Sequence, residues 1–334
     1  MSKTSLILFI FALGLVFSYF VLISFPYPNT VQKGVSFSIK KGENSSQVAE
    51  NLFSQKIIFS PLLFKFYLRV NQLEKEIKAG TYSIDLPITI EQLSQLIIEN
   101  HSNNTFLIKE GDTLKEIERN LKAAEMLKED ESLEVFLVRD FKDLFKDIEI
   151  QDYLDKPLEG FLYPDSYHLV KGITPKEIAE IFVTNFVKQI NGEIIAKTKQ
   201  QNKNFYEVLI IASLIEKEVK TYEDKRMVAD ILLKRLKQDM PLQVDASICY
   251  ANYRTFSDCE LTLSSFKTDS PFNLYLYKGL PPQPISNPSK ETILAVLEPL
   301  ENDFWYYLTD RKTGQTIFSK TYEEHQLARE KYLR

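Results

Sequence analysis

The stretch that most constrains the fold is residues 204–220, which combine helix-forming side chains with an almost unbroken apolar run. It contains no Gly or Pro, so we predict one helix over the whole stretch. Apolar side chains occur on more than one face of that helix, which predicts that most of it is buried. A chain that buries such a helix must build a hydrophobic core around it.

One carboxylate of this predicted helix, Glu216, projects onto its inward stripe, whereas Glu207 and Glu218 project to nearly the opposite side. A buried carboxylate is costly unless it is paired, protonated or open to a cleft. Burial also raises the pKa of a Glu, which suits a general acid near neutral pH. A structural Glu bonded to a backbone amide or an Arg explains the pattern equally well, so the helix alone leaves both interpretations open.

Composition narrows the classes of function. The 334 residues are 44% hydrophobic and 26% charged, which is typical of a globular chain of one to three domains. The net charge of −5, with basic and acidic residues mixed, predicts no nucleic-acid partner. No phosphate-binding Gly-rich loop, nucleophile elbow or zinc-ligand pattern occurs, so no cofactor or metal is predicted. Carboxylate chemistry is therefore favoured if the chain is an enzyme.

The N-terminus carries an apolar run without a charge at residues 6–25. As a helix it would be about 30 Å long, enough to cross the hydrocarbon core of a bilayer. A cleaved signal peptide would have a shorter apolar core and a small-residue cleavage site. We therefore predict a cytoplasmic tail at 1–4, a transmembrane anchor at 5–25 and an outward-facing remainder. In an oxidising compartment Cys249 and Cys259 could form a disulfide.

A short repeat follows the anchor. Residues 39–42 and 108–111 share an Ile-Lys-x-Gly pattern, and each copy precedes an amphipathic helical pattern. Each predicts a strand, a Gly turn and a helix, with Asn44 or Asp112 near the N-cap. The first copy continues with helices around 61–70 and 90–99 and a strand signal at 80–83. We predict a linker at 26–35, a small α/β subdomain over 36–103 and a second domain over 104–334.

The second domain begins with a strongly charged segment, residues 113–155, which predicts solvated helices joining the two halves. Residues 159–167 then interleave aromatic rings with carboxylates, a combination that suits a sugar-binding groove. An ordinary turn with core aromatics explains that spacing better. Residues 279–288 are rich in Pro and predict a rigid extended loop. The chain closes with strand signals at 304–308 and 315–318 and a helix from Tyr322.

Taken in order, five blocks carry a resemblance to a known family: residues 159–167, 212–218, 240–245, 270–275 and 279–288. Together they resemble the endolytic murein transglycosylase family, MltG/YceG-like. The resemblance implies an α+β fold: an N-terminal transmembrane helix, a small LysM-like α/β subdomain, and a mixed α+β, YceG-like catalytic domain built around a buried helix. Gln283 and Ser286 depart from the family pattern, which usually has Gly and Ala there.

The resemblance also implies an activity and a place in the cell. Members sit in the inner membrane with a periplasmic catalytic domain and cut nascent peptidoglycan strands between N-acetylmuramic acid and N-acetylglucosamine. They leave 1,6-anhydro ends and terminate strand elongation, working beside peptidoglycan synthases (penicillin-binding proteins). The family motif contains both Glu216 and Glu218. The helical projection selects Glu216 as the single catalytic acid, because residues two apart point about 200° away from each other.

The remaining candidate residues are assigned to substrate binding or site architecture: Glu159, Tyr163, Asp165, Gln243, Asp245, Asn273 and Tyr275. Two alternatives stay open. A hydrolytic muramidase would use Asp165 or Asp245 as a second carboxylate that activates water. A non-catalytic cell-wall binding or scaffold protein would hold glycan through its LysM-like unit without needing Glu216.

Overall fold

The computed structural model describes residues 23–333 except 41, 99–104, 147, 170–172, 191 and 311. The anchor predicted at 5–25 therefore lies almost wholly outside the described residues. Within the described part, no helix has the length and apolar character needed to cross a membrane. The chain divides into two compact units, Met1–Thr105 and Phe106–Arg334, each of which is described by itself below.

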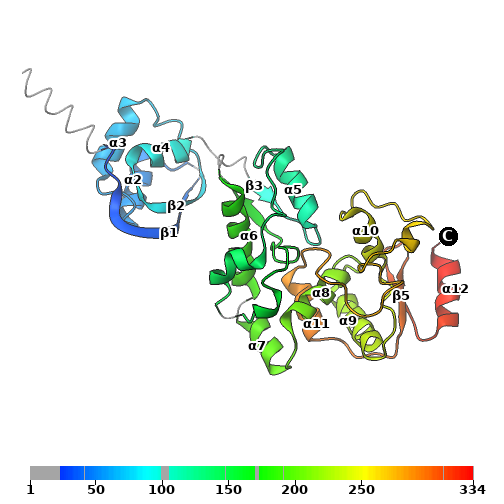
Figure 1. Cartoon of the computed structure of the whole chain (residues 1–334). Helices are drawn as coiled ribbons and strands as arrows, with labels where there is room; N and C mark the ends of the chain where they lie inside the picture. The colour runs from blue at the N-terminus through cyan, green and yellow to red at the C-terminus, as the bar shows by residue number, and fades with distance from the viewer. Residues whose placement is uncertain are drawn as a thin grey trace, which may run out of the picture. The chain divides into compact units, whose positions relative to one another are not determined.

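The N-terminal unit is a two-stranded antiparallel sheet covered by helices (Figure 1). Its elements are β1 Tyr27–Ile39, α2 Ser45–Ser54, α3 Pro61–Val70, β2 Gly80–Ile88 and α4 Ile90–Ile98. The two helices and the strand predicted after the first repeat copy are thus confirmed. The linker predicted at 26–35 is wrong, because β1 begins at Tyr27 and pairs with β2 from Tyr27↔Ile88 to Ile39↔Gly80.

Local capping explains where the helix of each repeat copy begins, the first in this unit and the second in the C-terminal unit. Asn44 caps α2 as predicted, and its side chain accepts from the backbone of Ser46 and Gln47. In the second repeat copy the cap of α5, Leu114–Ala123, is Thr113 and not Asp112. Asp112 instead accepts from the Lys109 amide at 2.9 Å and closes the preceding turn.

The C-terminal unit is a mixed α+β assembly, as predicted, in which helices dominate (Figure 1). Two small sheets pair β3 with β4 and β5 with β6. The C-terminal hairpin and closing helix are confirmed. The remaining elements, in chain order, are β3 Thr105–Leu107, the 3₁₀ helices η2 Val138–Leu144 and η3 Gln151–Tyr153, β4 Ser166–His168, α6 Pro175–Ile190, α7 Glu193–Gln200, α8 Phe205–Ile215, α9 Tyr222–Lys237, α10 Asp245–Tyr253, η4 Ser265–Lys267, α11 Lys290–Leu297, β5 Tyr306–Thr309, β6 Thr316–Ser319 and α12 Tyr322–Tyr332.

Helix α8 lies at the centre of this unit and packs against α9 and α11. Every residue of α8 except Glu207 is buried, which confirms the predicted burial. The predicted extension to residue 220 is wrong, because α8 ends at Ile215. Beyond it the Glu218 amide donates to the Ile215 carbonyl at 3.0 Å, a three-residue spacing that tightens the chain into a turn. Glu216, whose amide donates to the Ala212 carbonyl at 2.9 Å, keeps the α-helical projection, whereas Glu218 does not.

The charged segment 113–155 is not a solvated connector. Its apolar side chains, among them Ile117, Leu121, Phe141 and Phe145, belong to the same hydrophobic core as α8. The charged residues of α5 lie mostly on its outer face, and the helix is amphipathic. The segment therefore completes the core of the C-terminal unit.

Two of the sequence blocks and α8 meet at Gly160, whose φ of +90° favours glycine. A Cβ at this position would lie 2.7 Å from the Pro284 Cγ and 3.3 Å from the Leu209 Cδ2. The 159–167 block, the Pro-rich loop and α8 are thus in direct contact. This contact fixes the loop against the buried helix.

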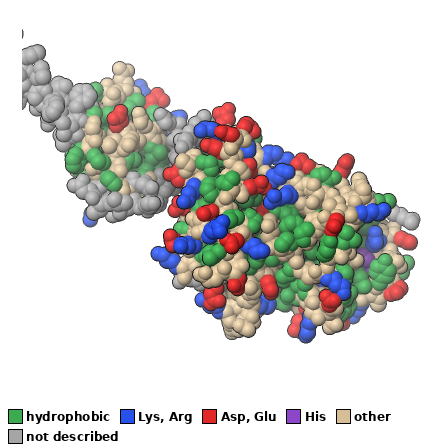
Figure 2. Space-filling model, in the orientation of Figure 1, with side chains coloured by type: hydrophobic (Ala, Val, Ile, Leu, Met, Phe, Trp, Pro, Cys, Tyr) green, Lys and Arg blue, Asp and Glu red, His purple; other side chains and the backbone are tan. Residues whose placement is uncertain are grey.

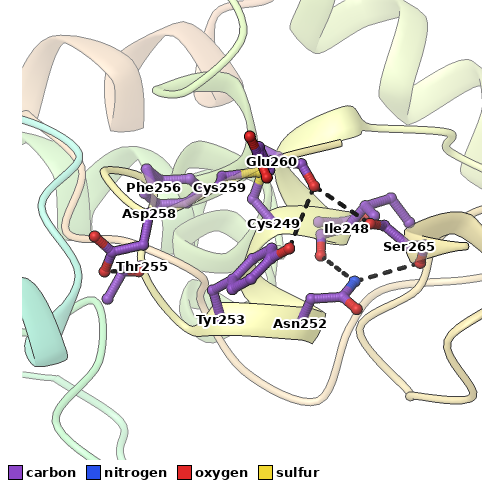
Figure 3. The surroundings of a disulfide bond; sticks show 12 residues. Ile248, Cys249, Asn252, Tyr253, Thr255, Phe256, Asp258, Cys259, Glu260 and Ser265 are labelled. Atoms are coloured by element: carbon purple, nitrogen blue, oxygen red, sulfur yellow. Dashed lines mark hydrogen bonds between the residues drawn. A yellow bond between two sulfur atoms is a disulfide. The ribbon is translucent and has the colours of Figure 1, made fainter. Parts of the chain in front are cut away.

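A disulfide joins Cys249 of α10 to Cys259, with the two Cα atoms 5.2 Å apart (Figure 3). The loop that it closes carries backbone amides of Phe256 and Ser257, which donate to the Glu116 Oε1 at 2.8 and 2.9 Å. The bridge therefore holds a loop that caps one end of α5.

We expect that Cys249→Ser/Cys259→Ser lowers the free energy of unfolding by about 2–3 kcal/mol, because the bridge restricts a short loop in the unfolded chain. Urea unfolding of the oxidised protein and of the variant measures the difference. Reduced wild-type protein is the matched control and should unfold like the variant. Equal stability of the oxidised protein and the variant would contradict the expectation.

Candidate active site

Glu216 lies in a closed polar network at the end of α8. Its side chain is 4% exposed, and its Oε1 is 2.9 Å from the Nζ of Lys225, which is equally buried. Its Oε2 accepts from the backbone amide and the hydroxyl of Ser289, each at 2.8 Å, and from the Thr292 hydroxyl at 2.6 Å. Ser289 is the N-cap of α11, so the carboxylate also faces the positive end of that helix.

These partners stabilise the charged form of Glu216. Burial acts to raise its pKa, but the Thr292 hydroxyl, the Lys225 charge and the Ser289 amide together outweigh burial, and the pKa lies below its ordinary value. At neutral pH Glu216 is an ion-paired carboxylate with no proton to donate. This arrangement matches the structural interpretation that the sequence left open.

A cleft of about 510 Å³ lies on the solvent side of this network. Ser289 lines it, and so does Tyr163, one of the predicted substrate-binding residues. The other lining residues are Glu110, Tyr222, Lys290, Glu291 and Leu294. The cleft touches the Ser289 cap, so it lies next to the network that holds Glu216.

Glu218 has a different environment, although it follows only two residues later. It is partly buried and contacts the N-terminus of α10 through a long bond of 3.4 Å from the Ala246 amide to its Oε1. Burial and the negative charge of Asp245 raise its pKa to about 7, while the Ala246 amide and the Tyr307 hydroxyl oppose the rise. Glu218 therefore holds its proton to a higher pH than an ordinary Glu.

The Tyr307 hydroxyl is buried and makes no hydrogen bond of good geometry within the described part of the chain. It nevertheless lies close enough to Glu218 to lower the pKa of that carboxyl. The Thr309 hydroxyl donates to the Glu218 carbonyl at 3.3 Å. Strand β5 thus positions Glu218 from one side while α10 positions it from the other.

Two of the predicted residues, Asp245 and Tyr275, lie near Glu218, and Gln243 belongs to the same loop as Asp245. Asp245 is exposed at the first position of α10, and its carboxylate accepts from the Tyr275 hydroxyl. Gln243 is also exposed, with a left-handed φ of 54°, and its amide donates to the Leu274 carbonyl at 3.1 Å. The 240–245 and 270–275 blocks therefore meet at this carboxyl.

Glu159 and Asn273 are buried in the framework and do not face a groove. Glu159 is 1% exposed, and it accepts from the Leu114 amide at 2.9 Å and from the Tyr250 hydroxyl at 3.0 Å. Burial raises the pKa of Glu159 to about 8. The Asn273 side-chain amide donates to the Phe266 and Thr268 carbonyls at 3.0 and 2.9 Å. Of the two roles predicted for Glu159, site architecture fits these contacts.

Asp165 lies at an exposed turn and makes no hydrogen bond to Glu216 or Glu218 within the described part of the chain. Its Oδ2 accepts from the Asn185 side chain at 2.9 Å, and its carbonyl accepts from the Ile108 amide at 3.0 Å. Phe161 and Tyr167 of the same block are buried in the core, which fits the interpretation of an ordinary turn. Tyr163 of the block lines the cleft beside Ser289.

Lys225, Ser289 and Tyr307 were not predicted from the sequence. Lys225 is a basic residue at a buried position of α9, so a period-3.6 analysis of that helix could have found it. Ser289 precedes α11 as an N-cap serine, which is a recognisable signal, but nothing local connects it to Glu216. Tyr307 lies in a short strand, and no local pattern indicates its neighbour Glu218.

A model of the YceG-like family matches residues 37–331. The endolytic murein transglycosylase of Bacillus subtilis (strain 168) is 28% identical over 312 residues, which cover 90% of this chain and 85% of that protein. The endolytic murein transglycosylase of Streptococcus pneumoniae serotype 2 is 26% identical over 324 residues, and the match covers 90% of this chain but 58% of that longer protein. A crystal structure of a yceG-like protein from Listeria monocytogenes is 29% identical, with a TM-score of 0.62, covering 90% of this chain and 100% of that one.

We expect Glu216→Gln to destabilise the protein by about 3–5 kcal/mol, because it leaves the buried Lys225 ammonium with only the exposed Glu291, at 3.9 Å, as a counter-charge. Glu216→Gln/Lys225→Met removes both charges and should recover much of that loss. Urea unfolding of the single and double variants measures both effects. A single variant as stable as the unmodified protein would contradict the structural role of Glu216.

Proposed function

Because the chain belongs to the YceG-like family, we propose that it is an endolytic murein transglycosylase, a lyase of peptidoglycan glycan strands. The observation that carries the proposal is the match, over 90% of this chain, to relatives that bear that name. The structure adds one carboxyl, Glu218, whose pKa of about 7 suits a general acid. The enzyme cuts the bond between N-acetylmuramic acid and N-acetylglucosamine and leaves 1,6-anhydro ends.

The geometry favours Glu218 over Glu216 as the catalytic acid. Proton donation from Glu216 would first require protonating a carboxylate that is bonded to Lys225, Ser289 and Thr292. Glu218 needs no such rearrangement, because burial and Asp245 already hold a proton on it near neutral pH. Glu216 remains the second candidate for the catalytic acid, because the cleft lined by Ser289 lies next to its network.

The proposed reaction uses one carboxyl twice. Protonated Glu218 donates its proton to the glycosidic oxygen as the bond from the muramic acid C1 breaks. The resulting carboxylate then accepts the proton of the muramic acid 6-hydroxyl, whose oxygen bonds to C1 and closes the anhydro ring. The proton returns to Glu218, so no water is consumed and no second carboxylate is needed to activate one.

In the proposed reaction Asp245 is the charged neighbour of the catalytic acid. Its charge raises the pKa of Glu218, and its carboxylate is held by the Tyr275 hydroxyl. A muramidase would instead use such a neighbour to activate water. Asp165, the other residue considered for that role, makes its contacts at a turn with Asn185 and Ile108. Asp245 is therefore the carboxylate on which the hydrolytic alternative depends.

Localisation forms a further part of the proposal. Residues 5–25 would anchor the chain in the inner membrane and leave both units in the periplasm, next to the synthases that make nascent strands. The disulfide Cys249–Cys259 supports an oxidising compartment. The order strand–helix–helix–strand in the N-terminal unit, with antiparallel β1 and β2, supports a LysM-like unit. Trimming of nascent strands by this enzyme would terminate their elongation.

We expect the chain without residues 1–25 to release muropeptides one water lighter than hydrolysed ones, and Glu218→Gln to slow that release by about 10²–10⁴-fold, since it cannot donate a proton. Mass spectrometry of digested peptidoglycan provides the measurement. Glu216→Gln is the matched control, and it should retain activity at a temperature where it is folded. Reducing ends in place of anhydro ends would instead identify a muramidase.

Two further outcomes would change the assignment. A folded Glu216→Gln without activity, beside an active Glu218→Gln, would return the catalytic role to Glu216. Activity that survived both substitutions would place the acid elsewhere. If neither the unmodified chain nor the variants yielded product while all of them pelleted with cell wall, a binding or scaffold protein would be the better conclusion.

The pH dependence provides an independent test. Because the acid works in its protonated form and its pKa is about 7, kcat/KM should be level below that pH and fall about tenfold per pH unit above it. Asp245→Asn removes a charge that raises the pKa, so it should shift this alkaline limb to lower pH. Initial rates on soluble glycan strands from about pH 5 to about pH 9 measure the shift. If the alkaline fall in kcat/KM of Asp245→Asn occurred at the same pH as in the unmodified protein, Asp245 would have no effect on the pKa of the catalytic acid.

A further inference from the structure

Helix α3 of the N-terminal unit exposes an apolar stripe. Leu62, Phe66 and Val70 are 76%, 51% and 54% exposed. They are spaced by four residues, so they lie along one face of α3. The opposite face is buried through Phe64, Tyr67 and Leu68. The helix is therefore apolar on both its inner and its outer face, although the outer face of a surface helix is usually polar.

The stripe borders a groove of about 610 Å³, to which Phe59 and Leu63 also contribute. Lys65 and Arg69 line the same groove, and an exposed ion pair of 3.4 Å joins Arg69 to Glu74. The groove thus combines apolar side chains with a small excess of positive charge. Figure 2 shows hydrophobic side chains at the surface of this unit among few charged ones.

The groove lies close to the point where the chain enters the unit. The ring of Tyr27, the first residue of β1, contacts the Phe59 ring at 5.7 Å between centroids. Ile23 is buried in the hydrophobic core of the same unit. The apolar run of the sequence ends at Phe25, so Pro26 alone separates it from β1. The step from Phe25 to Tyr27 covers two residues, which span at most about 7 Å. An anchor at 5–25 would therefore hold this unit against the membrane surface.

We propose that the α3 stripe docks onto the anionic outer surface of the membrane that holds the anchor. Leu62, Phe66 and Val70 enter the boundary between headgroups and acyl chains, as apolar faces of interfacial helices do. Lys65 and Arg69 contact the lipid phosphates. This proposal rests on the membrane anchor of the proposed function, and the position of the groove beside that anchor favours lipid as its occupant. Docking sets the height and orientation of the N-terminal unit above the bilayer.

Fluorescence quenching by lipids tests the contact in the full chain. Trp305 is the sole tryptophan and lies in the other unit, so Trp305→Phe provides a dark background. Phe66→Trp then reports on the stripe, and Glu91→Trp, at an exposed position of α4, is the matched control. Phe20→Trp in the predicted anchor shows that the chain has been reconstituted. Vesicles of phosphatidylglycerol and phosphatidylcholine carry doxyl-labelled lipid as the quencher.

We expect the Phe66→Trp variant to be quenched at least half as strongly as the Phe20→Trp variant, because both indoles would lie within reach of the labelled acyl chains. The Glu91→Trp variant should remain within about a tenth of its unquenched signal, since that position faces water. Adding Lys65→Glu/Arg69→Glu to Phe66→Trp should reduce its quenching to the level of the Glu91→Trp control, because repulsion replaces attraction at the headgroups.

Two results would overturn the proposal. Quenching of the anchor probe without quenching of the stripe probe would point to another occupant of the groove. Equal quenching of the stripe probe and the α4 control would show no preference of the stripe for lipid. The readout is independent of catalysis, so it can fail or succeed separately from the proposed function.

Discussion

The buried ion pair of Glu216 and Lys225 fixes the centre of the C-terminal unit. Removing two charges from water costs several kcal/mol per ion, which the pair offsets only if the remaining hydrogen-bonding capacity is also satisfied. Ser289 and Thr292, at the start of α11, donate the hydrogen bonds that the second oxygen of Glu216 needs. The network therefore joins the end of α8 to α9 and α11 at one point. It also fixes where α8 stops and, as a result, where the chain points when it reaches Glu218.

Local signals sufficed for much of the fold. The cap at Asn44, the Pro61 start of α3, the C-terminal hairpin and the burial of α8 all follow from short-range chemistry. The end of α8 does not, because Glu216 and its successors are good helix formers and only tertiary bonds stop the helix. The strand at 27–35 was missed for a related reason. Its pairing partner, β2, lies some fifty residues later and nothing local indicates it.

The site was predictable as a set of residues but not as an arrangement. Asp245 and Tyr275 lie near one carboxyl, although they are 30 positions apart in the sequence. Glu159 and Asn273 were chosen for the same chemical reasons but are buried in the framework. Residue type identifies polar groups that need hydrogen-bond partners. Burial decides whether such a group bonds to the protein or is open to a substrate. For single positions of loops, burial follows from tertiary packing, which no periodic sequence pattern encodes.

Two glutamates separated by one lysine thus show both solutions to the problem of a buried carboxyl. Glu216 keeps its charge, because a cation, a helix N-terminus and two hydroxyls surround it. Glu218 favours its proton, because burial and the repulsion of Asp245 raise its pKa to about 7 and its hydrogen-bond donors only partly oppose that rise. Raising its pKa from 4.5 to about 7 corresponds to about 3 kcal/mol against ionisation. This free energy keeps Glu218 protonated to a higher pH than an ordinary Glu, whereas placing a proton on Glu216 would require overcoming its network of partners. The same sequence motif therefore holds one acid charged in an ion pair and favours the proton on the other, which is the acid that we propose for catalysis.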